Sequence, residues 1–324
     1  MSLRRVLVCV CLATACFGAP TSSQEPALST TVRLVIAPTT VIAADGRYVD
    51  GLTQKDFLLY DNGRPQRIQS DVTFVPISLV IAVQANTLAA EALNKVHRIG
   101  PMIEPLIIGE RGEAAVLSYD DQLSVFQQFT SNAGRLATAF KRIPPSGDQA
   151  RMIDAAAEGI RMLAARPANR RRVLLLIGET RDRASKTKLQ DAVTLAQQEN
   201  VTVYTLSFSA FRERFTEGPG AIPSLVSFDP VAVFREIARL AKTNAAEAFS
   251  KYTGGSHLSF LKQKGLERAI SRIGEELHSQ YLLSFTSSAQ PGDQFHSIEV
   301  RVKNRPDVVV RTRPGYWLSA PGQN

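Results

Sequence analysis

The stretch that decides the fold is "ISLVIAVQANTLAA" (77–90), in which an apolar run stops at a short polar loop. Residues 77–83 have the continuous apolar character of a strand that is buried on both faces of a parallel sheet. From Leu88 onward, apolar residues recur at helical spacing until Gly100 and Pro101 break or kink the helix. The stretch therefore predicts a strand–loop–helix junction, where ligands bind in many α/β proteins.

The alternation of strands and helices continues from this junction to about residue 290. Strands are predicted at 113–119, 123–129, 173–177 and 201–206, and helices at 153–164, 189–196, 231–251 and 266–277. Residues 208–230 contain several glycines and prolines and predict a long loop, and residues 279–285 predict a final parallel strand. The fold class expected for 76–290 is α/β: a doubly wound, mostly parallel sheet with helices on both faces.

The regions outside this domain are predicted to be β extensions. Residues 31–75 predict a small β module, because turn dipeptides at 45–46 and 62–63 separate strand-like segments. Residues 291–318 predict a hairpin that packs on the core, followed by a tail at 319–324. The sequence leaves open whether the two β regions join each other or the central sheet.

The first residues predict an export signal. Residues 1–19 contain two arginines, an apolar segment and then small residues, and residues 20–30 predict a flexible leader. All three cysteines, Cys9, Cys11 and Cys16, lie in the first 16 residues, so cleavage leaves no disulfide framework and no cysteine nucleophile. We expect a periplasmic or extracellular protein, with lipid attachment at Cys16 as the alternative and the only expected contact with a membrane.

The net charge does not point to nucleic acid. The chain has 38 basic and 30 acidic residues, for a formal charge of +8. The basic residues are scattered, and the densest cluster, 170–172, directly precedes a predicted strand. A solvated strand entry explains this cluster, and an exported protein has little contact with nucleic acid.

The common catalytic motifs are missing from the sequence. There is no phosphate-binding loop, no dinucleotide fingerprint, no G-x-S-x-G nucleophile turn and no H-E-x-x-H pair. We therefore expect a protein that is not an enzyme. Acids in the predicted loops, Asp148, Glu179 and Asp182, leave an uncharacterised hydrolase as a weaker alternative.

Several phrases together resemble the von Willebrand factor type A (vWA) domain and, more narrowly, the VWFA-related proteins of Acidobacteria. They are "DFLLYDNGRPQRI" (56–68), "PISLVIAV" (76–83), "RGEAAVLSYDDQLSVFQQFTS" (111–131), "RRRVLLLIGETRD" (170–182), "VTVYTLSFS" (201–209), "YTGG" (252–255) and "QYLLSF…SIEVRVK…RPGYW" (280–317). The resemblance covers residues 31–318. It implies a vWA fold and a metal-ion-dependent adhesion site (MIDAS), in which loop side chains hold Mg²⁺ and the ion binds a carboxylate of a protein ligand.

The chain departs from the D-x-S-x-S ligand pattern that the resemblance implies. In the best register, Gln84 replaces the Asp, Asn86 the first Ser and Leu88 the second. A register shifted by one restores a hydroxyl at Thr87 but places Val83 at the Asp position. Neither register keeps the carboxylate that a hard cation prefers.

The second and third loops of the implied site are altered as well. Ala150 stands where the second loop of the family supplies a Thr, with Asp148 nearby, and the acid of the third loop is Glu179. We therefore expect a degenerate MIDAS without a metal cofactor, while a rearranged Mg²⁺ site around Asp148 and Glu179 is the alternative.

Two interpretations of the polar loop remain open. Asn86 or Thr87 can cap the helix that starts at Leu88, or Gln84, Asn86 and Thr87 can bind a partner together with Asp148 and Glu179. The function we expect is a metal-free protein-binding module whose partner is another protein, with 208–230 as a further candidate loop. The alternative is an envelope scaffold that forms homo-oligomers through its β regions.

Overall fold

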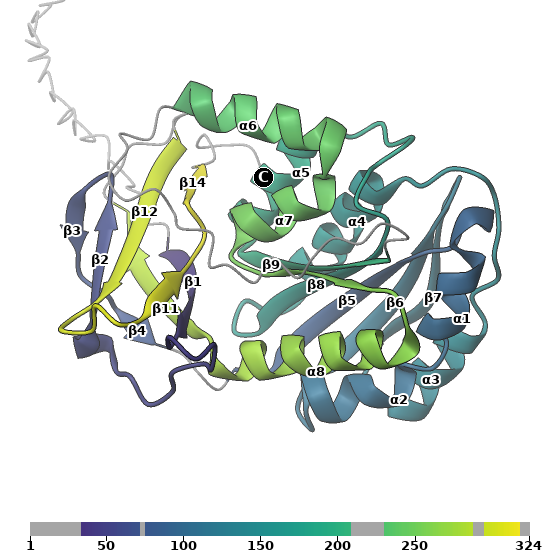
Figure 1. The fold of residues 1–324 in the computed structure, drawn as a ribbon, viewed down its shortest axis with the longest axis horizontal. Helices are drawn as coiled ribbons and strands as arrows, with labels where there is room; N and C mark the ends of the chain where they lie inside the picture. Colours follow the sequence, from purple (N-terminus) through teal and green to yellow (C-terminus); the bar gives the residue numbers. More distant parts are fainter. Residues whose placement is uncertain (1–33, 72–74, 209–229, 288–294, 318–324) are drawn as a thin grey trace, which may run out of the picture. The chain divides into compact units, whose positions relative to one another are not determined.

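The computed structural model describes residues 34–71, 75–208, 230–287 and 295–317 (Figure 1). The predicted export signal, the leader, most of the predicted 208–230 loop and the C-terminal tail lie outside the described residues. None of the helices in these ranges combines the length and apolar character that a membrane crossing requires.

The central sheet has six strands in the order β10-β9-β8-β5-β6-β7. They are β5 (Ile77–Gln84), β6 (Glu113–Tyr119), β7 (Leu123–Thr130), β8 (Arg171–Gly178), β9 (Val201–Phe208) and β10 (His257–Phe260). β7 runs antiparallel to β6, and the other neighbours are parallel. The strand order reverses between β5 and β8, so the predicted doubly wound α/β fold is confirmed.

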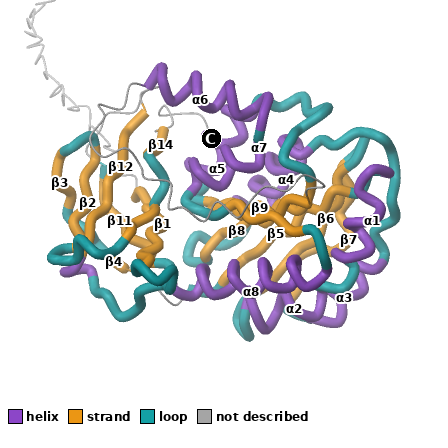
Figure 2. Tube along the Cα trace, viewed as in Figure 1, coloured by secondary structure: helices purple, strands orange, loops and turns teal. Residues whose placement is uncertain are grey.

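Helices cover both faces of this sheet (Figures 1 and 2). The apolar cluster on one face includes residues of α4 (Met152–Ala164), α5 (Leu189–Gln198), α6 (Pro230–Thr243) and α7 (Ala245–Thr253). The cluster on the other face includes residues of α1 (Ala90–Val96), α2 (Gly100–Ile103), α3 (Ala133–Lys141) and α8 (Gln263–Ser279). Helices such as α4, α7 and α8 bury apolar residues against the strands, whereas α6 packs on α5 and α7.

Two predicted helices need correction, and one strand was not predicted. The helix expected from Leu88 to Gly100 consists of the short 3₁₀ turn η2 (Thr87–Ala89) and α1, and it ends at Val96, before Gly100. Gly100 is the first residue of α2, which is followed by the π-helical turn η3 (Glu104–Ile108). The helix expected at 231–251 is interrupted at Asn244, whose side chain accepts a hydrogen bond from the backbone of Glu247 and caps α7. The edge strand β10 was not predicted.

The β regions from both ends of the chain pair with each other. Two four-stranded sheets have the orders β13-β1-β11-β4 and β14-β12-β2-β3. Their strands are β1 (Leu34–Ile42), β2 (Phe57–Asp61), β3 (Arg64–Gln66), β4 (Ser70–Asp71), β11 (Tyr281–Thr286), β12 (Phe295–Val302), β13 (Val309–Arg311) and β14 (Gly315–Trp317), with a 3₁₀ turn η1 (Gln54–Asp56) before β2. The strand predicted at 279–285 is present as β11, but its predicted parallel orientation is wrong, because β11 runs antiparallel to β1.

An ion pair with a buried carboxylate joins the first of these β sheets to the α/β region. Glu276 of α8 is 1% exposed and accepts a hydrogen bond from the hydroxyl of Tyr204 of β9 at 3.1 Å. The same carboxylate forms an ion pair with Arg311 of β13. Burial and the neighbouring carboxylate raise the pKa of Tyr204 well above its usual value, so the phenol stays protonated and remains a donor.

Candidate functional site

The predicted site residues meet at the carboxyl ends of β5 and β8. Gln84 is the last residue of β5, Glu179 follows β8, and Asp148 lies in the segment between α3 and α4. This is the point where the strand order reverses, and open α/β sheets bind their ligands in this place. The loops identified from the sequence therefore share one edge of the sheet.

Gln84 connects the first loop to the third. Its side chain is buried, and its Nε2 donates to Oδ1 of Asn86 at 2.9 Å. Its Oε1 accepts a hydrogen bond from the backbone N–H of Glu179 at 2.7 Å. Both ends of the amide are thus used within the protein, in the position where the vWA pattern has a carboxylate.

Residue 178 must be a glycine, because the position that a Cβ would take is already occupied by neighbouring side chains. A Cβ at Gly178 would lie 2.0 Å from the hydroxyl of Tyr119 and 2.7 Å from Oε1 of Gln84. Tyr119 is fully buried, and burial raises the pKa of its phenol, with Asp182 and Glu179 contributing in the same direction. The Tyr119 phenol and the Gln84 amide therefore fill the space next to Gly178 at the carboxyl end of β8.

Asn86 confirms the prediction that the polar loop caps the following helical segment. Its Oδ1 accepts a hydrogen bond from the backbone N–H of Ala89 at 3.2 Å, which makes Asn86 the N-cap of η2. Its Nδ2 donates to the backbone oxygen of Asp148 at 3.3 Å. The hydroxyl of Thr87 donates to Oδ1 of Asp148 at 3.0 Å. These hydrogen bonds connect the loop after β5 to the loop that contains Asp148.

Asp121 holds the second loop, a role that the sequence did not reveal. Oδ1 of Asp121, in the turn between β6 and β7, accepts a hydrogen bond from the backbone N–H of Gln149 at 3.0 Å. Gly147 has a φ of +67°, and a Cβ there would lie 2.6 Å from Oδ2 of Asp121. Only a glycine gives the loop this conformation so close to the carboxylate.

The acids after β8 are also engaged with neighbours. Glu179 forms an ion pair with Arg183, with an oxygen–nitrogen distance of 3.0 Å. Oδ1 of Asp182 accepts hydrogen bonds from the backbone N–H of Ile153 at 2.9 Å and from the hydroxyl of Ser185 at 2.6 Å. Asp182 therefore serves as an acceptor for the first turn of α4.

Asp154 fixes the segment that follows Asp182. Its carboxylate accepts hydrogen bonds from the backbone N–H groups of Lys186 at 3.1 Å and Thr187 at 2.9 Å, and from Arg151 at 2.7 and 2.9 Å. Burial alone would raise its pKa, but the hydrogen bonds from Thr187, Lys186 and Arg151 lower it from 3.8 to about 2. The ionised carboxylate thus ties α4 to residues 182–187.

The donor set does not fit a conventional Mg²⁺ site. Ala150 and Val83 are buried and offer no side-chain oxygen, and the Gln84 amide is used at both ends. The carboxylate of Glu179 is paired with Arg183, and that of Asp148 accepts the Thr87 hydroxyl. Mg²⁺ requires several free oxygen ligands in octahedral geometry. Within the described ranges, no group of three His, Cys, Asp or Glu residues is arranged to hold a metal ion.

Leu88 is the prominent apolar group at this face. It is 67% exposed, although leucine is usually buried, and it directly follows Thr87 in η2. The sequence pattern marked Leu88 only as a missing metal ligand. Its exposure instead gives the loop an apolar tip beside the polar side chains.

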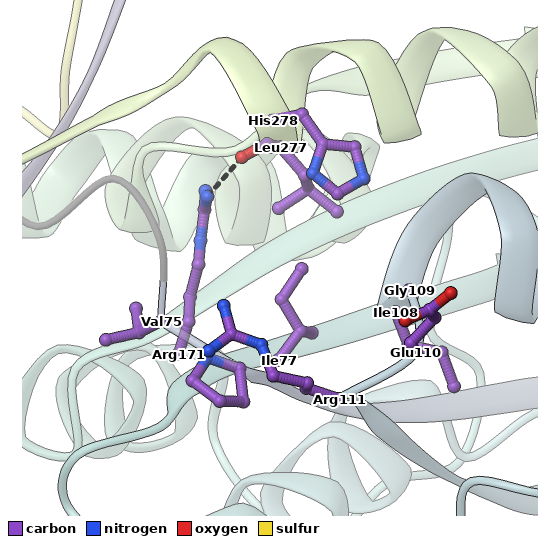
Figure 3. Close-up of a pocket in the computed structure, with 10 residues that line it drawn as sticks. Val75, Ile77, Ile108, Gly109, Glu110, Arg111, Arg171, Leu277 and His278 are labelled. Carbon is purple, nitrogen blue, oxygen red and sulfur yellow. Dashed lines mark hydrogen bonds between the residues drawn. The ribbon is translucent and has the colours of Figure 1, made fainter.

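A hollow of about 310 Å³ lies at the opposite, amino-terminal ends of β5 and β8 (Figure 3). Its lining includes Ile77, Arg111, Arg171 and His278. The guanidinium of Arg171 is held by the backbone oxygen of Leu277 and by the side chain of Gln280. Arg171 thus links β8 to the end of α8, and this hollow is separate from the predicted site.

Comparisons with known proteins give distant structural similarities. Neither a protein-family model nor a curated protein sequence matches the chain. An aerotolerance-related membrane protein from Bacteroides fragilis is similar with a TM-score of 0.43 and 13% identity, over 62% of this chain and 99% of that one. The VWA domain of SpRpn10 has a TM-score of 0.37 and 12% identity, over 61% and 94%.

A further similar structure is proximal thread matrix protein 1 of the mussel byssus, determined with a zinc-occupied MIDAS motif. Its TM-score is 0.45 at 11% identity, over 68% of this chain and 50% of that one. This chain therefore spans half of the mussel protein.

Proposed function

We propose that this chain is an exported, vWA-like protein-binding module with a degenerate MIDAS, and that a protein partner binds the face at Gln84, Leu88 and Asp148 without a metal ion. The observation that carries the proposal is the 67% exposed Leu88 beside loops that hydrogen bonds hold in place. The signal-like pattern at 1–19 supports a periplasmic or extracellular location, with Cys16 as the alternative lipid anchor.

The metal-free part of the proposal follows from how the loops are held. In a metal site, the cation brings the ligand loops together; here Gln84 joins the first loop to the third, and Asn86 and Thr87 join the first to the second. Buried amides that are fully hydrogen-bonded stabilise a unique loop arrangement. The loops therefore need no ion to remain in place for a partner.

The proposed contact surface has the composition of a protein interface. Leu88 supplies an exposed apolar side chain, and Thr87, Asp148 and the Glu179–Arg183 ion pair supply polar groups around the same loops. Interfaces commonly combine an apolar centre with a polar rim, and arginine is enriched at their energetic centres.

A catalytic role is not part of the proposal. The acids that suggested a hydrolase are engaged as described: Asp182 with the backbone of α4, Glu179 with Arg183 and Asp148 with Thr87. General acid–base catalysis needs a group that can exchange protons with a substrate. We also propose no nucleic-acid partner, since the basic residues of the sequence are scattered.

The test is a quantitative pull-down from an envelope extract of the source cell, performed in EDTA. The bait is the wild-type protein, Leu88→Glu or the control Leu34→Glu, which changes a 47% exposed leucine of β1. We expect a defined partner to be retained by wild type and by the control but lost with Leu88→Glu. Titration calorimetry with Mg²⁺, Mn²⁺ and Ca²⁺, on wild type and on Glu179→Ala, tests the metal-free part separately.

Either part can fail. A partner that is released by EDTA, or stoichiometric cation heat that Glu179→Ala abolishes, would show that the site binds metal in a rearranged form. Equal retention by Leu88→Glu would exclude the proposed face. If light scattering shows a concentrated sample to be a defined oligomer and no other partner is retained, the scaffold alternative replaces the binding proposal.

A further inference from the structure

The edge strand β7 has an open side. β7 lies at one end of the sheet order, and among the described strands it pairs with β6 alone. An edge strand presents backbone N–H and C=O groups that can pair with another chain. The sequence of β7, "LSVFQQFT", contains no charged residue and no proline, so of the usual devices against edge pairing it has only the irregular register of its pairing with β6.

A hollow of about 590 Å³ adjoins this edge, between β7 and α3. Val125 pairs with Leu117 and Gln127 pairs with Val116, so Phe126 is an extra residue that forms a bulge. The side chains that line the hollow come from both elements: Phe126 and Gln127 from β7, and Arg135, Thr138 and Arg142 from α3 and its C-cap. The hollow thus lies where the strand bends.

The charge around the hollow is of one sign. From Gln122 to Gly147 the sequence contains three cations and no acidic residue. Two of the cations, Arg135 and Arg142, line the hollow, and within the described ranges neither side chain forms an ion pair. Arg135 lies in the first turn of α3, where the helix dipole disfavours a positive charge. An anion bound in the hollow would offset this cost.

The positive charge of α3 also indicates which kind of chain can pair with β7. If a second copy paired its β7 with this one, two sets of cations on α3 would approach each other, and like charges across an interface are unfavourable. An acidic segment would meet complementary charge. We propose that β7 binds an extended segment of a partner protein, which adds to the sheet as a strand and places acidic side chains beside Arg135 and Arg142.

This surface does not rest on the proposed function, because it uses none of the residues at Gln84, Leu88 or Asp148. The test uses two fluorescent peptides of alternating sequence, acetyl-(Glu-Val)₄-amide and acetyl-(Lys-Val)₄-amide, titrated against the purified chain. A third peptide, acetyl-(Glu-Pro)₄-amide, keeps the negative charge but lacks half of the backbone donors. We expect the Glu-Val peptide to bind and the other two to bind at least about tenfold more weakly.

Charge-reversal variants test whether the Glu-Val peptide binds beside Arg135 and Arg142. Arg135→Glu/Arg142→Glu should weaken the Glu-Val peptide by about tenfold or more. The control is Arg64→Glu/Arg67→Glu, which makes the same change in net charge on exposed residues in and beside β3 and should leave affinity unchanged. Hydrogen exchange should show slower exchange in 122–131 when the peptide is bound.

Three results would overturn the proposal. The first is an absence of saturable binding at millimolar peptide, which is the result expected if the bulge blocks edge pairing. The second is equal affinity for the Glu-Val and Lys-Val peptides, or an equal loss in the two double variants. The third is a homodimer in light scattering that Val125→Lys converts to monomer, because the edge would then be occupied by a second copy.

Discussion

Replacing Asp154 by asparagine tests how the loop beside the candidate site is held. The carboxylate accepts four hydrogen bonds from Arg151, Lys186 and Thr187, and its pKa is lowered from 3.8 to about 2. A shift of that size corresponds to about 2 kcal/mol of stability at neutral pH. Asp154→Asn removes the charge, and its amide N–H₂ group cannot accept the bonds that an oxygen accepted.

The sign of the pH dependence follows from the lowered pKa. The folded state prefers the ionised carboxylate, so the stabilisation is complete above the unfolded pKa and is lost as the pH falls toward the folded value. We expect Asp154→Asn to lose about 2 kcal/mol of unfolding free energy relative to wild type at pH 7, but only about 1 kcal/mol at pH 3.

The assay is urea unfolding followed by circular dichroism, with the variant compared to wild type at each pH. The control is Asp45→Asn, which removes an exposed carboxylate that is paired with Arg47 in a turn and should change stability much less. A loss of equal size at pH 7 and pH 3 would refute the reasoning, because it would show that packing, and not the ionised carboxylate, is responsible.

Other substitutions test the remaining contacts, all by urea unfolding. Gly178→Ala should cost about 3 kcal/mol, since its Cβ would lie 2.0 Å from the Tyr119 hydroxyl, whereas Gly265→Ala, with no contact closer than 3.6 Å, should be neutral or stabilising. Asn86→Ala should cost about 1 kcal/mol by removing the N-cap, and a cost near zero would contradict the capping role. Glu276→Gln should cost about 3 kcal/mol, because it leaves the partly buried guanidinium of Arg311 without its carboxylate; a neutral effect would contradict the ion pair.

The central sheet was predictable because its signals are local. A continuous apolar run such as 173–177 must be buried on both faces, and a stripe such as that of 153–164 must face the sheet. The N-cap at Asn86 was predictable for the same reason, since a cap depends on residues three positions apart. β10 was missed because its four residues follow directly after a helix cap at Gly254 and carry little strand pattern of their own.

The remaining features depend on partners that are distant in the sequence. The strand at 281–286 is apolar in either orientation, and only pairing with β1 makes it antiparallel. The role of Asp121 depends on a loop 27 residues away, and the second bond of Gln84 depends on a backbone N–H after β8. A polar residue in a loop shows which bonds it can form, but the fold decides which groups come within reach.

The pairing of β1 with β11 and of β2 with β12 also has a consequence for the order of folding. The strands of the α/β region pair within one continuous stretch of chain. In contrast, Leu34 of β1 pairs with Thr286, and Leu59 of β2 pairs with Val300, so these partners are far apart in the sequence. Contacts between such distant segments form slowly, because a long loop must close first. During synthesis, β1 therefore emerges as an unpaired strand and β2 can pair only with β3, and both remain open to aggregation or chaperone binding until β11 and β12 have been made.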